Sequence, residues 1–165
     1  MPSGLPGRRA AATVAVVLAV GVVLTGCSGG NSRGDSTSVF KVSSGECFVP
    51  PEKVQAELTK IDQVPCNKAH TQEAYASVAY KASTPSFDSL TADYPGETVL
   101  KQFADGACAQ RFSTYVGVDY QDSSLFFTYL IPSARSWQQA HDRRVVCFIT
   151  TTGSLLRKSV KGSKL

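Results

Sequence analysis

The longest periodic pattern of apolar residues lies in residues 97–117, with the sequence ETVLKQFADGACAQRFSTYVG. Apolar side chains recur there every three to four positions, which is the spacing of one face of an amphipathic helix. The stripe consists of Leu100, Phe103, Ala104, Ala107, Cys108, Phe112 and Tyr115. The segment follows Pro95-Gly96, and Gly117 is a typical helix stop. The pattern predicts one long helix with a single buried face.

Three other segments have the composition of β-strands. Residues 124–132, SLFFTYLIP, are rich in aromatic and branched side chains and end with a proline. Residues 143–152, RRVVCFITTT, are apolar at consecutive positions from Val145 to Ile149, as expected of a central strand covered on both faces. A third strand is predicted around Tyr75–Tyr80. One long helix with strands that can pair antiparallel indicates the α+β class.

The segments between these elements have weaker signals. Residues 133–141 predict a short helix or turn, residues 52–60 a helical turn or loop, and residues 83–95 a loop. No strand order follows from these patterns.

The N-terminus has the pattern of an export signal. Arg8 and Arg9 precede an uncharged apolar run that extends to Gly26, and small residues come before Cys27. About 17 apolar residues is also the lower limit for a membrane-spanning helix. The sequence Leu24-Thr25-Gly26-Cys27 favours the signal, because it resembles the bacterial lipobox, in which the cysteine sulfur receives a diacylglycerol and the chain is cut before it. The competing interpretation is an ordinary signal peptide or anchor with an incidental cysteine.

This interpretation divides the chain into three parts. Residues 1–26 form the lipoprotein signal peptide, residues 27–38 a flexible tether without large apolar side chains, and residues 39–165 one globular domain. Arg8 and Arg9 leave with the signal, so the formal net charge of +4 falls to about +2. So small a charge argues against nucleic acid as a partner.

Four cysteines remain after Cys27, and an even number in an exported chain favours two disulfides with three possible pairings. We predict Cys47–Cys66 and Cys108–Cys147, because the helix that carries Cys108 is expected to pack on the strand that carries Cys147. A zinc site is the alternative, but no C-x-x-C pair occurs. The predicted fold is therefore a small antiparallel sheet packed against one main helix and stapled by two disulfides.

The cysteines and the motifs around them resemble the septum formation domain family of actinobacterial exported proteins. The resemblance extends from about Gly45 to Ser163 and includes the segment Gly45-Glu46-Cys47-Phe48. It continues in the segment CNKAHTQE at residues 66–73, where alanine replaces the proline that is usual in the family. Its later positions are Cys108, Trp137, Asp142, Arg143 and Cys147.

The resemblance implies a role in the cell envelope or in division, without an established reaction. Together with the lipobox, it predicts a non-enzymatic lipoprotein held by its lipid on the outer face of the cytoplasmic membrane. Its partners would be the membrane, through the lipid anchor, and an envelope protein, a division protein or a wall polymer. No cofactor or metal is implied.

The alternative is a cell-wall hydrolase or a metal-dependent enzyme that uses His70 and Glu73, the closest pair of a histidine and a carboxylate. They could serve as a base and its orienting partner, or as two metal ligands. In the structural interpretation, His70 bonds to the backbone beside the Cys66 disulfide, and Glu73 caps a backbone group or pairs with a base. The H-E-x-x-H zinc signature is absent.

The last candidate residues surround the only tryptophan. Trp137 could offer a ring on which a carbohydrate stacks, although a single tryptophan beside a central strand more commonly belongs to the core. Asp142 and Arg143 are expected to brace the turn beneath Trp137.

Overall fold

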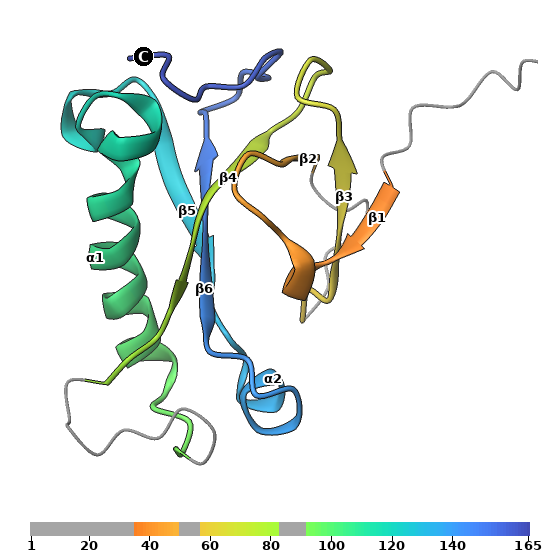
Figure 1. Cartoon of the computed structure of the whole chain (residues 1–165), viewed down its shortest axis with the longest axis vertical. Helices are drawn as coiled ribbons and strands as arrows, with labels where there is room; N and C mark the ends of the chain where they lie inside the picture. Colours follow the sequence, from red (N-terminus) through yellow and green to blue (C-terminus); the bar gives the residue numbers. More distant parts are fainter. Residues whose placement is uncertain (1–34, 50–56, 83–91) are drawn as a thin grey trace, which may run out of the picture. The chain divides into compact units, whose positions relative to one another are not determined.

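The computed structural model describes residues 35–49, 57–82 and 92–165. They form a six-stranded antiparallel sheet and one long helix (Figure 1). The strands are β1 Asp35–Ser38, β2 Cys47–Val49, β3 Lys60–Val64, β4 Gln72–Ala79, β5 Phe126–Leu130 and β6 Arg144–Thr150. The helices are α1 Glu97–Val116 and α2 Ala134–Gln139, with short 3-10 turns at Val39–Lys41 and Tyr120–Asp122. The predicted α+β fold is confirmed.

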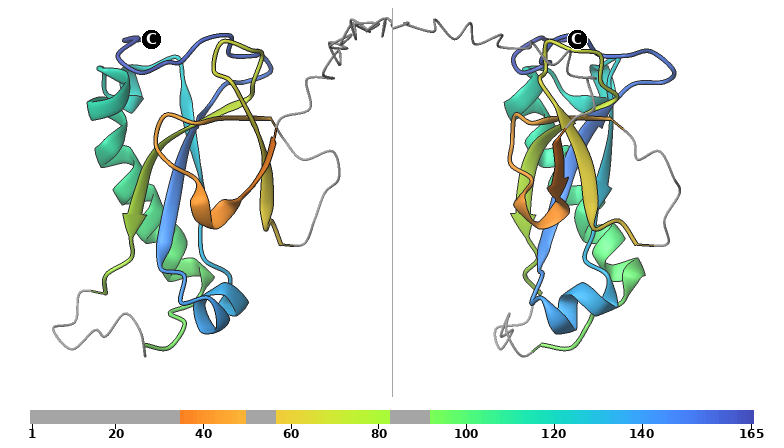
Figure 2. Two further views of the ribbon diagram at one scale, coloured as in Figure 1. Left: turned by 45° about the vertical axis from the view of Figure 1, so that its right-hand side comes forward. Right: turned by 90° about the vertical axis from the view of Figure 1, so that its right-hand side faces the viewer.

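The strand order is β1-β3-β2-β4-β6-β5, and every neighbouring pair is antiparallel. Helix α1 lies along β4, β6 and β5, while β1 and β3 lie away from it (Figure 2). Among the described residues, no helix is long and apolar enough to cross a membrane.

Helix α1 forms where its apolar stripe predicts it. Its buried side chains are Leu100, Ala104, Cys108, Phe112, Tyr115 and Val116. Gly117 ends the helix in the left-handed conformation, at φ 92°, and its N–H donates to the carbonyl of Ser113. Most residues adopt that conformation with difficulty, so glycine is the usual residue at this position.

Strand β6 is covered on both faces, as its continuous apolar run predicts. Val145, Cys147 and Ile149 belong to the core beneath α1. Val146 and Phe148 belong to a second core on the opposite face, where Phe148 makes an edge-to-face contact with Phe48 of β2. The sheet therefore has two apolar faces, of which α1 covers one.

Both predicted disulfides are present. Cys47–Cys66 joins β2 to the turn after β3, and Cys108–Cys147 joins the middle of α1 to β6. The second bond lies in the core, where both cysteines are completely buried.

Three strands were not predicted. Strand β1, with the sequence DSTS, carries no apolar side chain, so its pairing with β3 through backbone groups leaves no pattern in the sequence. Its four residues lie in the segment expected to be a tether, and the sheet begins at Asp35 rather than at Val39. Strands β2 and β3 are short. Within β3, Ile61 is the only buried residue.

The predicted signal peptide, Cys27 and residues 28–34 of the predicted tether lie outside the described residues. The same holds for residues 50–56 and 83–91, which include most of the two predicted loop segments.

The chain after β6 crosses the end of the sheet beside the C-terminal end of α1 (Figure 1). Leu156 forms an isolated antiparallel bridge with His70 just before β4. Gly162 and Lys164 donate their N–H groups to the carbonyls of Tyr115 and Val116, at 2.8 and 2.9 Å. The last turn of α1 is thereby held by the C-terminal segment, which we define as residues 151–165.

We expect removal of the two disulfides to have unequal effects on stability. In the loop-entropy relation, the 39-residue separation of Cys108 and Cys147 corresponds to about 4 kcal/mol, and the 19-residue separation of Cys47 and Cys66 to about 3 kcal/mol. Replacing Cys108 and Cys147 by alanines should lower the free energy of unfolding, measured by urea denaturation, more than replacing Cys47 and Cys66. Equal losses, or a larger loss for Cys47–Cys66, would contradict this.

Candidate functional site

The structure brings His70 and Glu73 together in a buried polar cluster at the end of the sheet. Their side chains are completely buried, and Nε2 of His70 lies 3.9 Å from Oε2 of Glu73. His70 precedes β4 and Glu73 is its second residue, so the turn into the strand lets two side chains three positions apart converge.

The Glu73 carboxylate accepts hydrogen bonds from two other parts of the chain. Tyr115 of α1 and Ser159 of the C-terminal segment each donate a hydroxyl to Oε1 at 2.6 Å, and the N–H of Val160 donates to Oε2 at 2.9 Å. Burial raises the pKa of Tyr115, and the hydrogen bond to Glu73 raises it further, so this phenol stays protonated as a donor. A buried carboxylate with several donors is a stable arrangement.

His70 is fixed by its backbone and by one ring nitrogen. Its N–H and carbonyl pair with Leu156, and Nδ1 lies 2.7 Å from the carbonyl of Lys68. Nε2 has no hydrogen-bond partner. Cys47, directly opposite Glu73 in the pairing of β2 with β4, places its sulfur in the same cluster. One ligand atom from each of Cys47, His70 and Glu73 lies within 4.8 Å of the others.

The side chains of His70 and Glu73 are not exposed to solvent in this structure. Neither residue lines the cavity of ≈ 510 Å³ beside α2 or the cavity of ≈ 190 Å³ beside Trp137. In the disulfide form of the protein, the hydrogen bonds of Glu73 join β4, α1 and the C-terminal segment, which is a structural role.

Trp137 is also buried, with 1 % of its surface exposed. Its ring makes edge contacts with Tyr80 and Tyr94, and its Nε1 donates to the carbonyl of Ala92 at 2.8 Å. The guanidinium of Arg143 stacks on the ring, with Cζ 3.7 Å from the centroid. The tryptophan therefore has no free face on which a carbohydrate could stack.

Arg143 and Asp142 hold the turn that follows α2. Arg143 donates from Nη1 to the carbonyl of Trp137 at 2.7 Å and to the carbonyl of Asp142 at 3.0 Å. Asp142 accepts the N–H of Arg144 at 3.1 Å, at the start of β6. These residues lie at the opposite end of β6 from the cluster of His70 and Glu73, so the candidate polar residues do not form one site.

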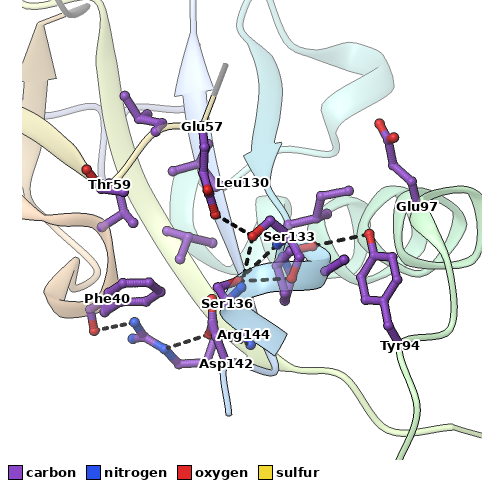
Figure 3. Close-up of a pocket in the computed structure, with 16 residues that line it drawn as sticks. Phe40, Glu57, Thr59, Tyr94, Glu97, Leu130, Ser133, Ser136, Asp142 and Arg144 are labelled. Carbon is purple, nitrogen blue, oxygen red and sulfur yellow. Dashed lines mark hydrogen bonds and ion pairs between the residues drawn. The ribbon is translucent and has the colours of Figure 1, made fainter. Parts of the chain in front are cut away.

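An open cavity of ≈ 510 Å³ lies beside α2, and we call it the α2 pocket. Figure 3 shows Phe40 and Arg144 on one side of it and Tyr94 and Glu97 on the other, with Ser133 between them. Its apolar lining consists of Val39, Phe40, Leu58, Leu130, Ile131, Pro132, Ala134 and Val146. A concave, mainly apolar surface with a few polar groups is typical of a binding site.

The charged side chains of the α2 pocket are mainly acidic. Glu57, Glu97 and Asp142 line it, whereas Arg144 is the basic residue among the described lining side chains. Arg144 donates to the carbonyl of Phe40 and lies 3.9 Å from Asp142. Ser133 donates its hydroxyl to Glu57.

Sequence analysis did not identify the α2 pocket. Its lining comes from five segments, at residues 39–40, 57–59, 94–97, 130–136 and 142–146, which come together only in the folded sheet. No spacing motif joins them. The 40 % exposure of Phe40, which lies beside the first described strand, is visible only in the structure.

The hydrogen bond between Tyr115 and Glu73 can be tested by Tyr115→Phe. The variant leaves the aromatic ring in place and removes a donor to a buried carboxylate, so the free energy of unfolding should fall by about 1.5–3 kcal/mol. Tyr120→Phe is the matched control, because Tyr120 is 38 % exposed, and it should change stability by less than about 0.5 kcal/mol. Chemical denaturation measures both, and equal stability of the two variants would contradict the role given to Tyr115.

Comparison with known proteins places these features in a family. The relatives include two proteins of Mycobacterium tuberculosis, the uncharacterized membrane protein MT3943 of strain CDC 1551 / Oshkosh and the uncharacterized membrane protein Rv3835 of strain ATCC 25618 / H37Rv. Each is 24 % identical over 119 residues, which cover 72 % of this chain and 26 % of the relative. The match thus spans about a quarter of the length of these relatives. No solved structure matches the chain.

The family model described as septum formation matches residues 44–162. The matched range contains both disulfides, β2 to β6 and both α-helices. The chain belongs to the septum formation family.

Proposed function

We propose that this protein is a membrane-anchored extracytoplasmic lipoprotein and a non-enzymatic module of the cell envelope, with a role in septum formation. We propose further that it binds an envelope or division protein at the α2 pocket. The observation that carries the proposal is the contrast between two sites. The residues with catalytic potential are completely buried, whereas the open cavity has an apolar lining and contains no pair of a histidine and a carboxylate.

The anchor is supported by Leu24-Thr25-Gly26-Cys27 after a basic and apolar leader. Two or more acyl chains on one cysteine would give stable attachment, whereas a single chain gives marginal attachment. The relatives in Mycobacterium tuberculosis are named membrane proteins, which agrees with a location at the membrane. Two disulfides agree with an oxidising compartment outside the cytoplasm.

The non-enzymatic role is supported by the surroundings of His70 and Glu73. They converge, as an enzyme would require, but a general base must reach its substrate, and both side chains are completely buried. Glu73 already accepts three hydrogen bonds. A wall hydrolase built on this pair would have to open the C-terminal segment before each turnover.

The chemistry of the α2 pocket indicates the kind of partner. Its floor is apolar, and its lining has three carboxylates and one guanidinium. An extended segment of a protein with apolar side chains would complement the apolar lining. The three carboxylates of the lining already lie beside Arg135, Lys101 and Arg144 of the same chain. A wall polymer is the alternative occupant, and the test below would detect it.

Lipid attachment predicts a specific mature species. Intact-mass analysis of the membrane fraction should find a chain that begins at Cys27 and carries diacylglycerol on its sulfur. Cys27→Ala should remove the lipid and should leave the signal uncut at this position. A mature chain that begins at Ser28, or one that retains Met1 with an unmodified Cys27, would refute the anchor.

Partner binding predicts contacts that depend on position in the α2 pocket. A photoreactive amino acid placed at Phe40, which is 40 % exposed, should crosslink to an envelope or division protein in intact cells. The matched control is Leu155, which is 51 % exposed and lies in the C-terminal segment, away from the pocket. A fluorescent fusion of the protein should concentrate at septa, and Phe40→Ser should lower the fraction of fluorescence found there. Equal crosslinking at both positions, crosslinks to wall polymer alone, or uniform fluorescence would contradict the proposal.

A further inference from the structure

The unpartnered nitrogen of His70 is the starting observation. Nδ1 lies 2.7 Å from the carbonyl of Lys68, which can only accept, so Nδ1 carries the proton. In the neutral ring, Nε2 then carries a lone pair, and it lies 3.9 Å from a carboxylate oxygen of Glu73 without a hydrogen bond. Two electron-rich atoms face each other in a fully buried place, an arrangement that a cation between them would stabilise.

The third group at this place is sulfur. Cys47 lies opposite Glu73 in the β2–β4 pairing, and its Sγ, a nitrogen of His70 and an oxygen of Glu73 lie within 4.8 Å of one another. Ligand atoms around one tetrahedral zinc ion are about 3.5 Å apart, given bond lengths of roughly 2.0–2.3 Å. A contraction of about 1 Å would therefore bring the three atoms to bonding distance.

The surroundings of these ligands match those of a metal site. A metal-bound histidine usually donates its other ring N–H to a carbonyl or carboxylate, as Nδ1 of His70 does to Lys68. A metal-bound carboxylate is usually held by further hydrogen bonds, as Glu73 is by Tyr115, Ser159 and Val160. These bonds do not depend on the disulfide, so they would keep both ligands in place when the sulfurs separate.

We propose that reduction of the Cys47–Cys66 disulfide converts this cluster into a zinc site whose ligands are Cys47, His70 and Glu73. The fourth ligand is Cys66, whose sulfur is bonded to that of Cys47 in the disulfide form. The disulfide and the metal are then alternative states of the same two sulfurs. The set of donor atoms and their negative charge both fit Zn²⁺, because this ion binds thiolate, imidazole and carboxylate ligands. The proposal goes beyond the binding role of the α2 pocket and does not depend on it.

The chemical steps balance with a dithiol as the reductant. Its thiolate attacks Sγ of Cys66, the bond between Cys66 and Cys47 breaks, and Cys47 leaves as a thiolate. The second thiol of the reductant closes its own disulfide and releases Cys66. The dithiol is oxidised by two electrons, and the protein gains two thiols. Binding of Zn²⁺ then displaces two protons from those thiols.

Access favours this disulfide over the other. Cys66 is half-buried, so a reductant can reach its sulfur, whereas Cys108 and Cys147 are completely buried. Mild reduction should therefore open Cys47–Cys66 and leave the bond between α1 and β6 intact. The core would stay folded while the cluster changes state.

The experiment titrates the full chain in detergent micelles with ZnCl₂, before and after mild treatment with dithiothreitol, which is removed anaerobically. The reduced protein should bind one zinc ion per chain with release of two protons, measured with a chromophoric chelator and a pH indicator. Co²⁺ should give thiolate-to-cobalt charge-transfer absorption. The oxidised protein should bind no zinc at this site.

Variants separate this site from incidental binding. Cys47→Ser combined with Cys66→Ser keeps His70 and Glu73 and should abolish zinc uptake under reducing conditions. Tyr115→Phe should weaken the zinc affinity of the reduced protein about 10- to 100-fold, because it removes a bond that orients Glu73. The matched control is His141→Asn, since His141 is the other histidine, is exposed and lies at the far end of β6. It should leave the affinity unchanged.

The outcomes are decisive in either direction. One zinc per reduced chain, lost in the double serine variant and retained in His141→Asn, supports the proposal. Equal zinc uptake by oxidised and reduced protein, retention in the double serine variant, or loss in His141→Asn would overturn it. So would a reduced, folded protein that gives no cobalt charge-transfer absorption.

Discussion

The burial of one negative charge, the carboxylate of Glu73, determines how the end of this domain is built. Removing a carboxylate from water is unfavourable unless donors replace the lost solvent. Here the donors are Tyr115 at the end of α1 and Ser159 and Val160 in the C-terminal segment. Helix, sheet and C-terminal segment are therefore interdependent: none of the three can move away without leaving the charge with too few partners. The bridge between His70 and Leu156 adds a backbone connection at the same place.

The two faces of the sheet differ in how they are covered. On the face beneath α1, the Cys108–Cys147 bond and the aromatic contact between Tyr75 and Phe112 close the core. A register shift between Ala74 and Ala76 lets β4 direct both Tyr75 and Ala76 toward this face. The opposite face has a smaller core and no long helix over it among the described residues, and the α2 pocket lies at its edge.

The parts of this fold that the sequence predicts are those in which one element carries its own pattern. Helix α1 has a continuous stripe, and β6 is apolar at five consecutive positions, so each could be identified alone. The pairing of Cys108 with Cys147 followed from packing those two elements together. Strand β1 has no apolar side chain and is held by its backbone, so its place in the sheet depends on β3. The surroundings of Glu73 come from residues 42 to 87 positions away, and no local pattern encodes such contacts.

The early start of β1 would limit the distance between the domain and the membrane if Cys27 carries the proposed lipid. Seven residues lie between Cys27 and Asp35, and chain geometry limits the distance between these two residues to roughly 28 Å in any conformation. With a lipid on Cys27, the first strand of the sheet would begin close to the membrane surface. The α2 pocket would then encounter proteins that are confined to the region near the membrane surface. In such a region, local surface density rather than bulk concentration would govern how often the pocket is occupied.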